Sequence, residues 1–205
     1  GSISYALAAG NTVVFKPSEY APGVGVLLEE TFNEVAPFGD IFTTVTGLSE
    51  TGSALCLSGV DKISFTGSTH TAKLVAAQCA TVMTPVVLEC GGKDPVIVAA
   101  DADIKRAVDA TVWSAMANAG QSCIGAERVY VDEKVADEFI ARAIELAGTI
   151  HAGAPGDGNY GPATMPAQIK VIQSHIKAAI ADGGTCVYGG LQSIKSPFVQ
   201  PVVLV

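Results

Sequence analysis

Cys123 is a candidate nucleophile because of the turn that its sequence predicts. It ends the run Gly120-Gln121-Ser122-Cys123, which follows a predicted helix. A cysteine in a glycine-flanked turn can act as a thiolate and can offer its backbone N–H to a developing oxyanion. A free cysteine is, however, most often a small buried hydrophobe. Taken alone, the run therefore favours a structural role.

Glu89 is a candidate general base in the run LECGGK, at the end of a predicted strand at 86–88. The apolar residues of that strand predict an interior position. Burial raises the pKa of carboxyl groups in general, which suits a base that works near neutrality. The alternative is a structural ion pair between Glu89 and Lys93. The run by itself leaves these two interpretations open.

Lys16, Ser18 and Glu19 are of types that can bind a nucleotide ribose. They follow directly on a predicted strand at 12–15, and ligands of parallel sheets bind at the carboxyl ends of the strands. Lysine donates hydrogen bonds and glutamate accepts them, so ribose hydroxyls suit both side chains. The alternative is a solvated turn in which Ser18 caps the next helix, and the segment alone favours it.

Gly67 and Ser68 end the run FTGS, which leads from a predicted strand into a predicted helix. Free N–H groups at a helix N-terminus can hold a phosphate group. The alternative is an ordinary turn with Ser68 as the N-cap. The GxGxxG fingerprint of dinucleotide-binding folds is absent from the sequence.

The elements that must position these residues alternate between apolar strands and amphipathic helices. We place a domain boundary at Gly91-Gly92, giving domains of residues 1–90 and 91–205. Successive strand–helix–strand units predict parallel pairing and an α/β fold with a doubly wound sheet. The predicted strands are 12–15, 40–45, 62–65, 86–88, 95–98, 128–131, 187 and 199–204. The predicted helices are 21–36, 50–57, 69–80, 101 or 103 to 117, 135–150 and 166–181.

The composition is that of a globular protein, since 49% of the 205 residues are hydrophobic and 16% are charged. A formal net charge of -8 argues against nucleic-acid binding. The absence of a long apolar run or a signal sequence argues against a membrane protein. Five cysteines without a CxxC pair are neither a disulfide framework nor a metal site. We therefore expect a cytoplasmic protein without a bound metal.

The four motifs together resemble the aldehyde dehydrogenase superfamily in order and spacing. The matching segments are GNTVVFKPSE, FTGST, LECGGK and GQSC, and the resemblance extends through DPVIVAADAD, ERVYV and FVQP. It implies a Rossmann-like cofactor domain at residues 1–90 and part of a catalytic domain at 91–205. The chain ends inside an apolar run, so we interpret it as an internal fragment of a longer protein.

The resemblance implies an aldehyde as the small-molecule substrate. Cys123 would attack its carbonyl carbon to form a thiohemiacetal. A hydride would then pass to a nicotinamide cofactor, and Glu89 would activate the water that hydrolyses the remaining thioester. An alternative within the superfamily is acyl transfer to coenzyme A, whose enzymes usually lack this glutamate. Another is a catalytically inactive module with the same fold. A semialdehyde substrate, of the succinate-semialdehyde kind, is weakly indicated.

The resemblance also implies where the cofactor binds. Lys16 and Glu19 match positions that bind the adenosine ribose, and Gly47 matches a position near the adenine. Gly67 and Ser68 match the turn that binds the pyrophosphate. A carboxylate at Glu19 would repel a 2′-phosphate, so NAD is favoured over NADP. NADP remains possible because Lys16 and Ser18 can accept a 2′-phosphate.

Several parts of the family's machinery are expected outside this chain. They are an oxyanion-hole asparagine, a glutamate and a phenylalanine that grip the nicotinamide ribose, and the strands that form a homo-oligomer. Losing one oxyanion donor costs roughly 10²–10³ in rate. We therefore expect the isolated chain to be weakly active or inactive.

Overall fold

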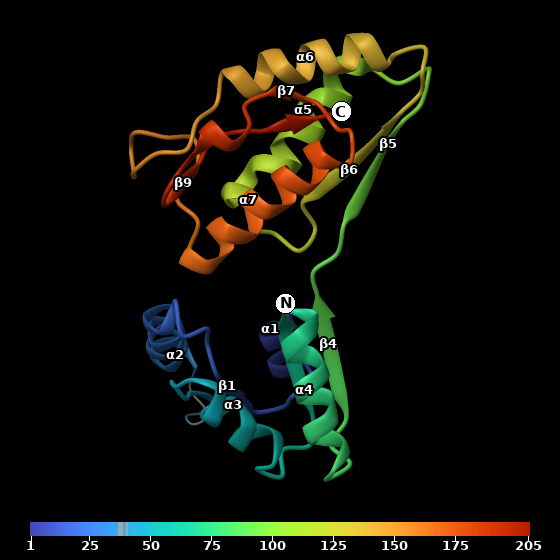
Figure 1. Ribbon diagram of the computed structural model, residues 1–205. Helices are drawn as coiled ribbons and strands as arrows, with labels where there is room; N and C mark the ends of the chain where they lie inside the picture. The colour runs from blue at the N-terminus through green and yellow to red at the C-terminus, as the bar shows by residue number, and fades with distance from the viewer. Residues whose placement is uncertain (37–38, 40) are drawn as a thin grey trace. The chain divides into compact units, whose positions relative to one another are not determined.

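The computed structural model describes residues 1–36, 39 and 41–205. The chain forms two compact units, Gly1–Cys90 and Gly91–Val205 (Figure 1). The division falls at the glycine pair at which the sequence predicted a domain boundary. The assignment of one unit to the cofactor and the other to the nucleophile stays a prediction. Each unit is described below by itself.

The first unit alternates between helices and strands. Its elements are α1 (Ser2–Ala8), β1 (Val13–Phe15), α2 (Pro22–Val35), β2 (Phe42–Thr44), α3 (Ser49–Cys56), β3 (Ile63–Gly67), α4 (Thr69–Ala80) and β4 (Val86–Cys90). The strand predicted at 40–45 is β2, and its predicted first residue, Asp40, lies outside the described residues. This alternation confirms the α/β class.

The strands of the first unit hydrogen-bond in two parallel pairs, β1 with β2 and β3 with β4. The sequence predicted one doubly wound sheet, whereas the described hydrogen bonds join these strands two by two. Each pair is connected through a helix, as parallel strands require. Helix α1 contacts both pairs, because it packs on β1 and its Ser2 hydroxyl bonds Ser64 of β3 at 2.9 Å.

Phe42 is the centre of the packing around the first pair. It is buried, and its ring lies 6.1 Å from that of Phe15 and 5.7 Å from that of Phe32 between ring centroids. Gly25 lets α2 approach the segment after β1 closely, since a Cβ at Gly25 would stand 2.7 Å from Cγ of Pro17. The apolar faces of α2 and β1 therefore fix the segment that follows β1.

Helices α3 and α4 pack together near their C-terminal ends. Cys56 and Cys79 are both buried there. The Gln78 amide donates to the Ser53 hydroxyl at 2.6 Å. Burial, with the neighbouring Cys79 thiol, raises the pKa of Cys56 to about 11. Cys56 is therefore a neutral thiol at physiological pH.

The second unit is a parallel strand pair with helices and two short antiparallel pairs. Strands β5 and β6 are parallel, while β7 pairs with β10 and β8 with β9 in antiparallel fashion. Its strands are β5 (Asp94–Val98), β6 (Ala126–Val131), β7 (Cys186–Tyr188), β8 (Ile194–Lys195), β9 (Phe198–Val199) and β10 (Val203–Leu204). Its helices are α5 (Ile104–Met116), η1 (Ala117–Gly120), α6 (Ala136–Gly148), α7 (Pro166–Ala181) and η2 (Leu191–Ser193).

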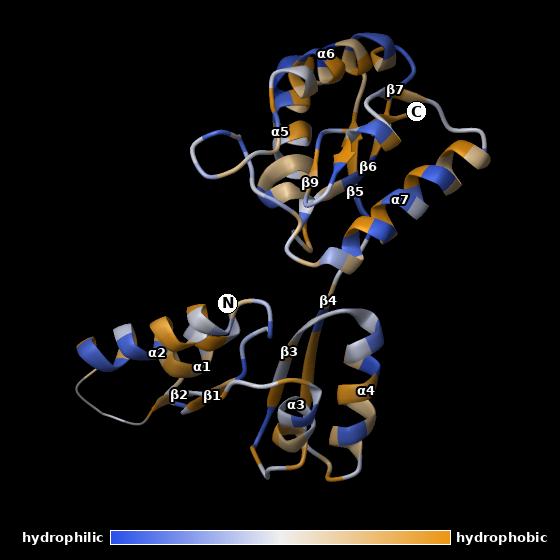
Figure 2. Cartoon of the chain, turned by 60° about the vertical axis from the view of Figure 1, so that its left-hand side comes forward, coloured by the Kyte–Doolittle hydropathy of each residue, from blue (hydrophilic) through white to orange (hydrophobic). Residues whose placement is uncertain are grey.

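The core of the second unit lies between β5, α5 and α6. Ile104, Val108 and Val112 recur every four residues, so they form one buried stripe of α5. This stripe packs on Phe139 and Ala143 of α6. The carboxylate of Asp103 caps α5 by accepting from the Arg106 N–H at 3.1 Å. Helix α7 is also amphipathic, because hydrophobic and hydrophilic residues alternate along it (Figure 2).

Residues 1–36, 39 and 41–205 contain neither a membrane-spanning helix nor a cluster of metal ligands. No helix there is both long and apolar enough to cross a membrane. No group of three or more His, Cys, Asp and Glu side chains in those ranges can hold a metal ion.

Candidate active site

Cys123 is exposed in a tight turn between η1 and β6. The turn spans residues 122–125 and is closed by the N–H of Gly125, which donates to the Ser122 carbonyl at 3.2 Å. Its exit is held by α5, because the Ser114 hydroxyl accepts from the Ala126 N–H at 3.1 Å. Among the described hydrogen bonds, none uses the backbone N–H of Cys123. The thiol and this N–H are therefore both available to a ligand.

The backbone just before this turn is left-handed at three consecutive residues. Asn118, Ala119 and Gly120 have φ angles of 54°, 61° and 70°. For residues other than glycine this conformation costs roughly 1–2 kcal/mol each. Such strain persists only where surrounding contacts enforce it, and it is common at functional sites.

Glu89 is exposed within β4, the fourth residue of a five-residue strand. The prediction that it is buried is wrong for this chain, since Glu89 is exposed. Within the second unit, the Lys93 ammonium pairs with Glu127. In the parallel register Glu89 lies opposite Thr66. The carboxylate is thus beside the end of β3.

Lys16, Ser18 and Glu19 lie in the segment between β1 and α2. The Lys16 ammonium donates to the Pro17 carbonyl at 3.0 Å, and its aliphatic chain passes Gly52 of α3. Ser18 accepts from the Tyr20 N–H at 3.2 Å. It is therefore a turn residue and not the cap of α2. Glu19 is exposed in the same turn.

Gly47 and Gly67 are both positions where a side chain has no room. Gly47 has a φ of 147°, and a Cβ there would overlap the Thr51 hydroxyl in the first turn of α3. A Cβ at Gly67 would stand 2.6 Å from Cζ of Phe65. Glycine at these two sites keeps the backbone close to the starts of α3 and α4.

Ser68 is the N-cap of α4, which was the alternative interpretation of this turn. Its hydroxyl accepts from the Thr71 N–H at 3.1 Å and lies 3.0 Å from the Thr71 hydroxyl. It is exposed, as is Gly67 before it. The other N–H groups of the first turn of this 12-residue helix have no partner within the helix.

The structure brings some of the predicted residues together. Glu89 and the Gly67-Ser68 turn lie at the same edge of the β3–β4 pair, because Gly67 pairs with Cys90. Lys16 lies against the helix that begins just after Gly47. Cys123 belongs to the second unit and the other predicted site residues to the first. The contacts of Gln121 and Ser114, which hold the cysteine turn, have no signature in the sequence.

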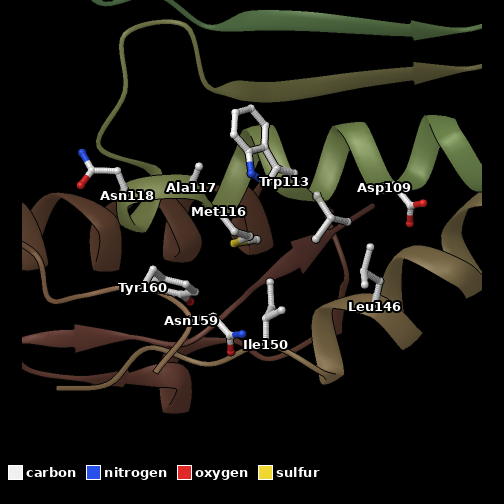
Figure 3. Close-up of a pocket in the computed structure, with 10 residues that line it drawn as sticks. Asp109, Trp113, Met116, Ala117, Asn118, Leu146, Ile150, Asn159 and Tyr160 are labelled. Atoms are coloured by element: carbon white, nitrogen blue, oxygen red, sulfur yellow. The ribbon is translucent and has the colours of Figure 1, made fainter. Parts of the chain in front are cut away.

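A hollow in the second unit lies beside η1 (Figure 3). Trp113 at its rim is 74% exposed, so its side chain does not belong to the buried core of this helix. It follows the buried Val112 and points away from the stripe that meets α6. Cys123 does not line the hollow. The described lining residues are Asp109, Val112, Trp113, Met116, Ala117, Asn118, Leu146, Ile150, Asn159 and Tyr160.

Tyr160 at this hollow is a hydrogen-bond donor. Its hydroxyl donates to the Val199 carbonyl at 2.9 Å. Burial, with the neighbouring Tyr188, raises the pKa of Tyr160 to about 12. The phenol is therefore protonated at neutral pH, and its proton is bonded to the Val199 carbonyl. A protonated phenol cannot act as a general base.

Fold and site together define a two-unit α/β protein, with an exposed thiol on one unit and a helix N-terminus beside a carboxylate on the other. The sequence profile described as "Aldehyde dehydrogenase family" matches residues 1–205. The chain therefore belongs to the aldehyde dehydrogenase family.

Two curated relatives are similar over nearly all of this chain. Betaine aldehyde dehydrogenase of Cereibacter sphaeroides is 40% identical over 202 residues, which are 97% of this chain and 42% of the relative. The 4,4'-diapolycopene aldehyde oxidase of a Methylomonas species is 37% identical over 97% of this chain and 37% of its own length. The chain thus spans about two fifths of these relatives.

Solved structures match the fold closely. PnpE in complex with nicotinamide adenine dinucleotide has a TM-score of 0.92 and 34% identity over 98% of this chain and 43% of that one. A point mutant of Staphylococcus aureus betaine aldehyde dehydrogenase, solved with NAD+ and a BME-modified cysteine, has a TM-score of 0.90 and 30% identity, with coverage of 98% and 43%. An Escherichia coli NADP-dependent enzyme has a TM-score of 0.90 and 34% identity, with coverage of 97% and 42%.

Proposed function

We propose that the complete protein containing this chain oxidises an aldehyde to a carboxylic acid with NAD, with Cys123 as nucleophile and Glu89 as general base. The observation that carries the proposal is the Cys123 turn. It combines an exposed thiol, a backbone N–H without a partner among the described residues and a strained backbone before it. These features suit a nucleophile and are unusual for a cysteine that only packs.

The first half of the reaction uses Cys123. Its thiolate attacks the aldehyde carbon, a C–S bond forms, and the carbonyl π electrons move to oxygen. The Cys123 N–H stabilises the oxyanion of this thiohemiacetal, the kind of contact that is worth about 10²–10³ in rate. Bound NAD would accept the hydride that leaves the thiohemiacetal carbon, which leaves a thioester on Cys123.

The second half uses Glu89. Its carboxylate takes a proton from water as the water oxygen attacks the thioester carbon. The C–S bond then breaks, the electron pair returns to sulfur, and the carboxylic acid leaves. Glu89 is exposed, so water can reach its carboxylate.

The residues of the first unit fit a dinucleotide. The Lys16 ammonium donates one hydrogen bond to the Pro17 carbonyl, so two of its N–H groups remain for ribose or phosphate oxygens. Ser68 and the first turn of α4 offer donors to a diphosphate. Gly47 would lie near the adenine. Glu19 would accept hydrogen bonds from the ribose hydroxyls and repel a 2′-phosphate, which favours NAD over NADP. If NADP binds, Ser18 and Lys16 would bind its 2′-phosphate.

A second candidate is acyl transfer to coenzyme A. It needs no carboxylate to activate water, so the retention of Glu89 favours hydrolysis. The similar proteins have betaine aldehyde, diapolycopene aldehyde and lactaldehyde in their names, and these differ too much in polarity and size to select a substrate. A semialdehyde, a cytoplasmic location and a homo-oligomer stay our predictions for the complete protein.

The test is NADH formation by the complete protein with a panel of short aldehydes and semialdehydes. We expect activity that Cys123→Ala abolishes and that Cys186→Ala, a change at a half-buried cysteine of the same unit, leaves intact. Free acid as the product, with no requirement for coenzyme A, supports hydrolysis. Full activity of Cys123→Ala would overturn the assignment of the nucleophile.

A further inference from the structure

Gln121 stands two residues before Cys123 and forms a reciprocal pair with Asn118. The N–H and the side-chain amide of Gln121 both donate to the Asn118 carbonyl, at 3.1 and 3.0 Å. In return the Asn118 side-chain amide donates to the Gln121 carbonyl at 3.1 Å. These bonds close a ring around Ala119 and Gly120. They therefore offset the strain of the left-handed backbone that leads to the cysteine turn.

The Gln121 side chain also ties the turn to a segment that is distant in the sequence. Its amide N–H donates to the Pro162 carbonyl at 3.2 Å, and its amide oxygen accepts from the Thr164 N–H at 2.7 Å. Because the oxygen meets a donor and the nitrogen meets acceptors, the amide has only one satisfied orientation. One side chain thus fixes both the shape and the position of the loop.

The segment at 162–164 is itself anchored. The N–H of Ala163 donates to the Pro197 carbonyl between β8 and β9 at 2.9 Å. Gln121 therefore joins the nucleophile turn to the β8–β9 hairpin in two steps. Its side chain bonds the backbone of residues 162 and 164, and the backbone of residue 163 bonds that of Pro197. Ser114 of α5 holds the other end of the same turn, so the turn is fixed at its entrance and at its exit.

We propose that Gln121 is a positioning residue for Cys123, because its amide clamps the left-handed loop and docks it on residues 162–164. The proposal rests on the proposed function of Cys123. A displacement of a reacting atom by about 1 Å can cost on the order of 10²-fold in rate. Loss of the clamp therefore lowers kcat while binding of the cofactor, which uses residues of the first unit, is unaffected.

The test uses Gln121→Glu and Gln121→Met in the complete protein. Glutamate keeps the acceptor for the Thr164 N–H and loses the donors to Asn118 and Pro162, while methionine loses all of them at similar length. The matched control is Gln192→Glu. Gln192 is an exposed glutamine of the same unit whose amide donates to the Gly189 carbonyl at 2.9 Å, three residues back, as Gln121 does to Asn118.

We expect kcat to fall at least about tenfold in both Gln121 variants, with KM for NAD within about twofold and the control unchanged. Unchanged kcat in a folded Gln121→Met protein would overturn the proposal. A parallel fall in kcat, NAD binding and Tm would also overturn it, because that pattern belongs to general destabilisation.

A second measurement separates this proposal from the proposed function. The rate of alkylation of Cys123 by iodoacetamide needs neither substrate nor cofactor, and peptide mapping assigns it to this thiol. We expect Gln121→Met to change that rate by about threefold or more, and Gln192→Glu to leave it unchanged. An unchanged rate counts against positioning even if Cys123→Ala is inactive. A changed rate with active Cys123→Ala keeps the clamp and rejects the nucleophile assignment.

Discussion

Thr66 and Glu89 lie opposite each other in the parallel pair β3–β4, each one residue before its strand ends. Residues opposite each other in register project to the same face of a sheet. The candidate base therefore shares a face and an edge with the strand that leads to Ser68. Acid–base chemistry and diphosphate binding would then depend on the same two strand ends.

Replacing Glu89 by glutamine separates the two halves of the proposed reaction. The amide cannot take a proton from water, so we expect one equivalent of NADH per site to form rapidly and turnover to fall by about 10²-fold or more. Stopped-flow absorbance measures both phases. Glu145→Gln, on the exposed side of α6, is the control. Loss of the rapid phase together with turnover would show that Glu89 acts before the thioester forms.

The five cysteines differ in exposure, which predicts their order of reaction. Cys123 is exposed, Cys90 and Cys186 are half-buried, and Cys56 and Cys79 are buried. We expect a thiol reagent to label Cys123 first and the buried pair only after unfolding, since access and thiolate content set the rate. Mass spectrometry of timed samples assigns the sites. Equal labelling of all five in the folded protein would contradict the structure.

Alkaline pH should weaken the fold through Cys56. The pKa of the thiol is near 9.0 in the unfolded chain and near 11 in the folded one. The folded state therefore holds the proton more tightly, and its stabilising contribution is complete below pH 9 and lost as the pH rises towards 11. The loss is at most about 3 kcal/mol. Urea unfolding at several pH values measures it, and Cys56→Ser should show a shallower decline between pH 9 and 11.

Glu19 is expected to set the choice of cofactor. Glu19→Gln removes the negative charge that would face a 2′-phosphate, so we expect the preference for NAD over NADP to fall by about tenfold. Steady-state kinetics with each cofactor measures the ratio. Glu30→Gln, an exposed change on α2, should leave it unaltered. If Glu19→Gln and Glu30→Gln showed the same preference for NAD over NADP, Glu19 would not belong to the ribose site.

Gly47 is expected to resist substitution. Alanine there would combine a positive φ with an overlap on Thr51, so we expect Gly47→Ala to lower the free energy of unfolding by about 2 kcal/mol or more. Gly23→Ala is the matched control, since a Cβ there meets nothing within 4 Å and the residue lies in α2. That change should be neutral or stabilise by about 0.5–1 kcal/mol. Urea unfolding of both variants compares them directly.

Local signals in the sequence were sufficient for several elements. Helix α4 was predicted from Thr69 to Ala80 and has those bounds, with Ser68 as its cap. Helix α7 was predicted from Pro166 to Ala181 and has those bounds, with a proline in its first turn, where proline is favoured. The run of apolar residues in β4 indicated a strand but not which face is covered, so Glu89 was wrongly expected to be buried.

The clamp on the nucleophile turn could not be predicted in the same way. Gln121 and Thr164 are 43 residues apart, and their hydrogen bond exists only because the loop at 162–164 folds back on η1. A glutamine and a backbone N–H have no pairing rule that a single sequence reveals. The left-handed conformation of Ala119 likewise does not follow from residue preference, whereas asparagine, as at position 118, is enriched in that conformation.

Helices α3 and α4 start at the positions proposed for adenine and diphosphate and meet at their far ends through Cys56 and Cys79. If the proposed assignment holds, the N-termini of the two helices would bind the nucleotide, and their C-terminal ends pack together near Cys56 and Cys79. A bulkier side chain at Cys56 or Cys79 would then change the distance between the two N-termini. The fit of the cofactor would depend partly on two small buried residues at the opposite ends of the helices that bind it.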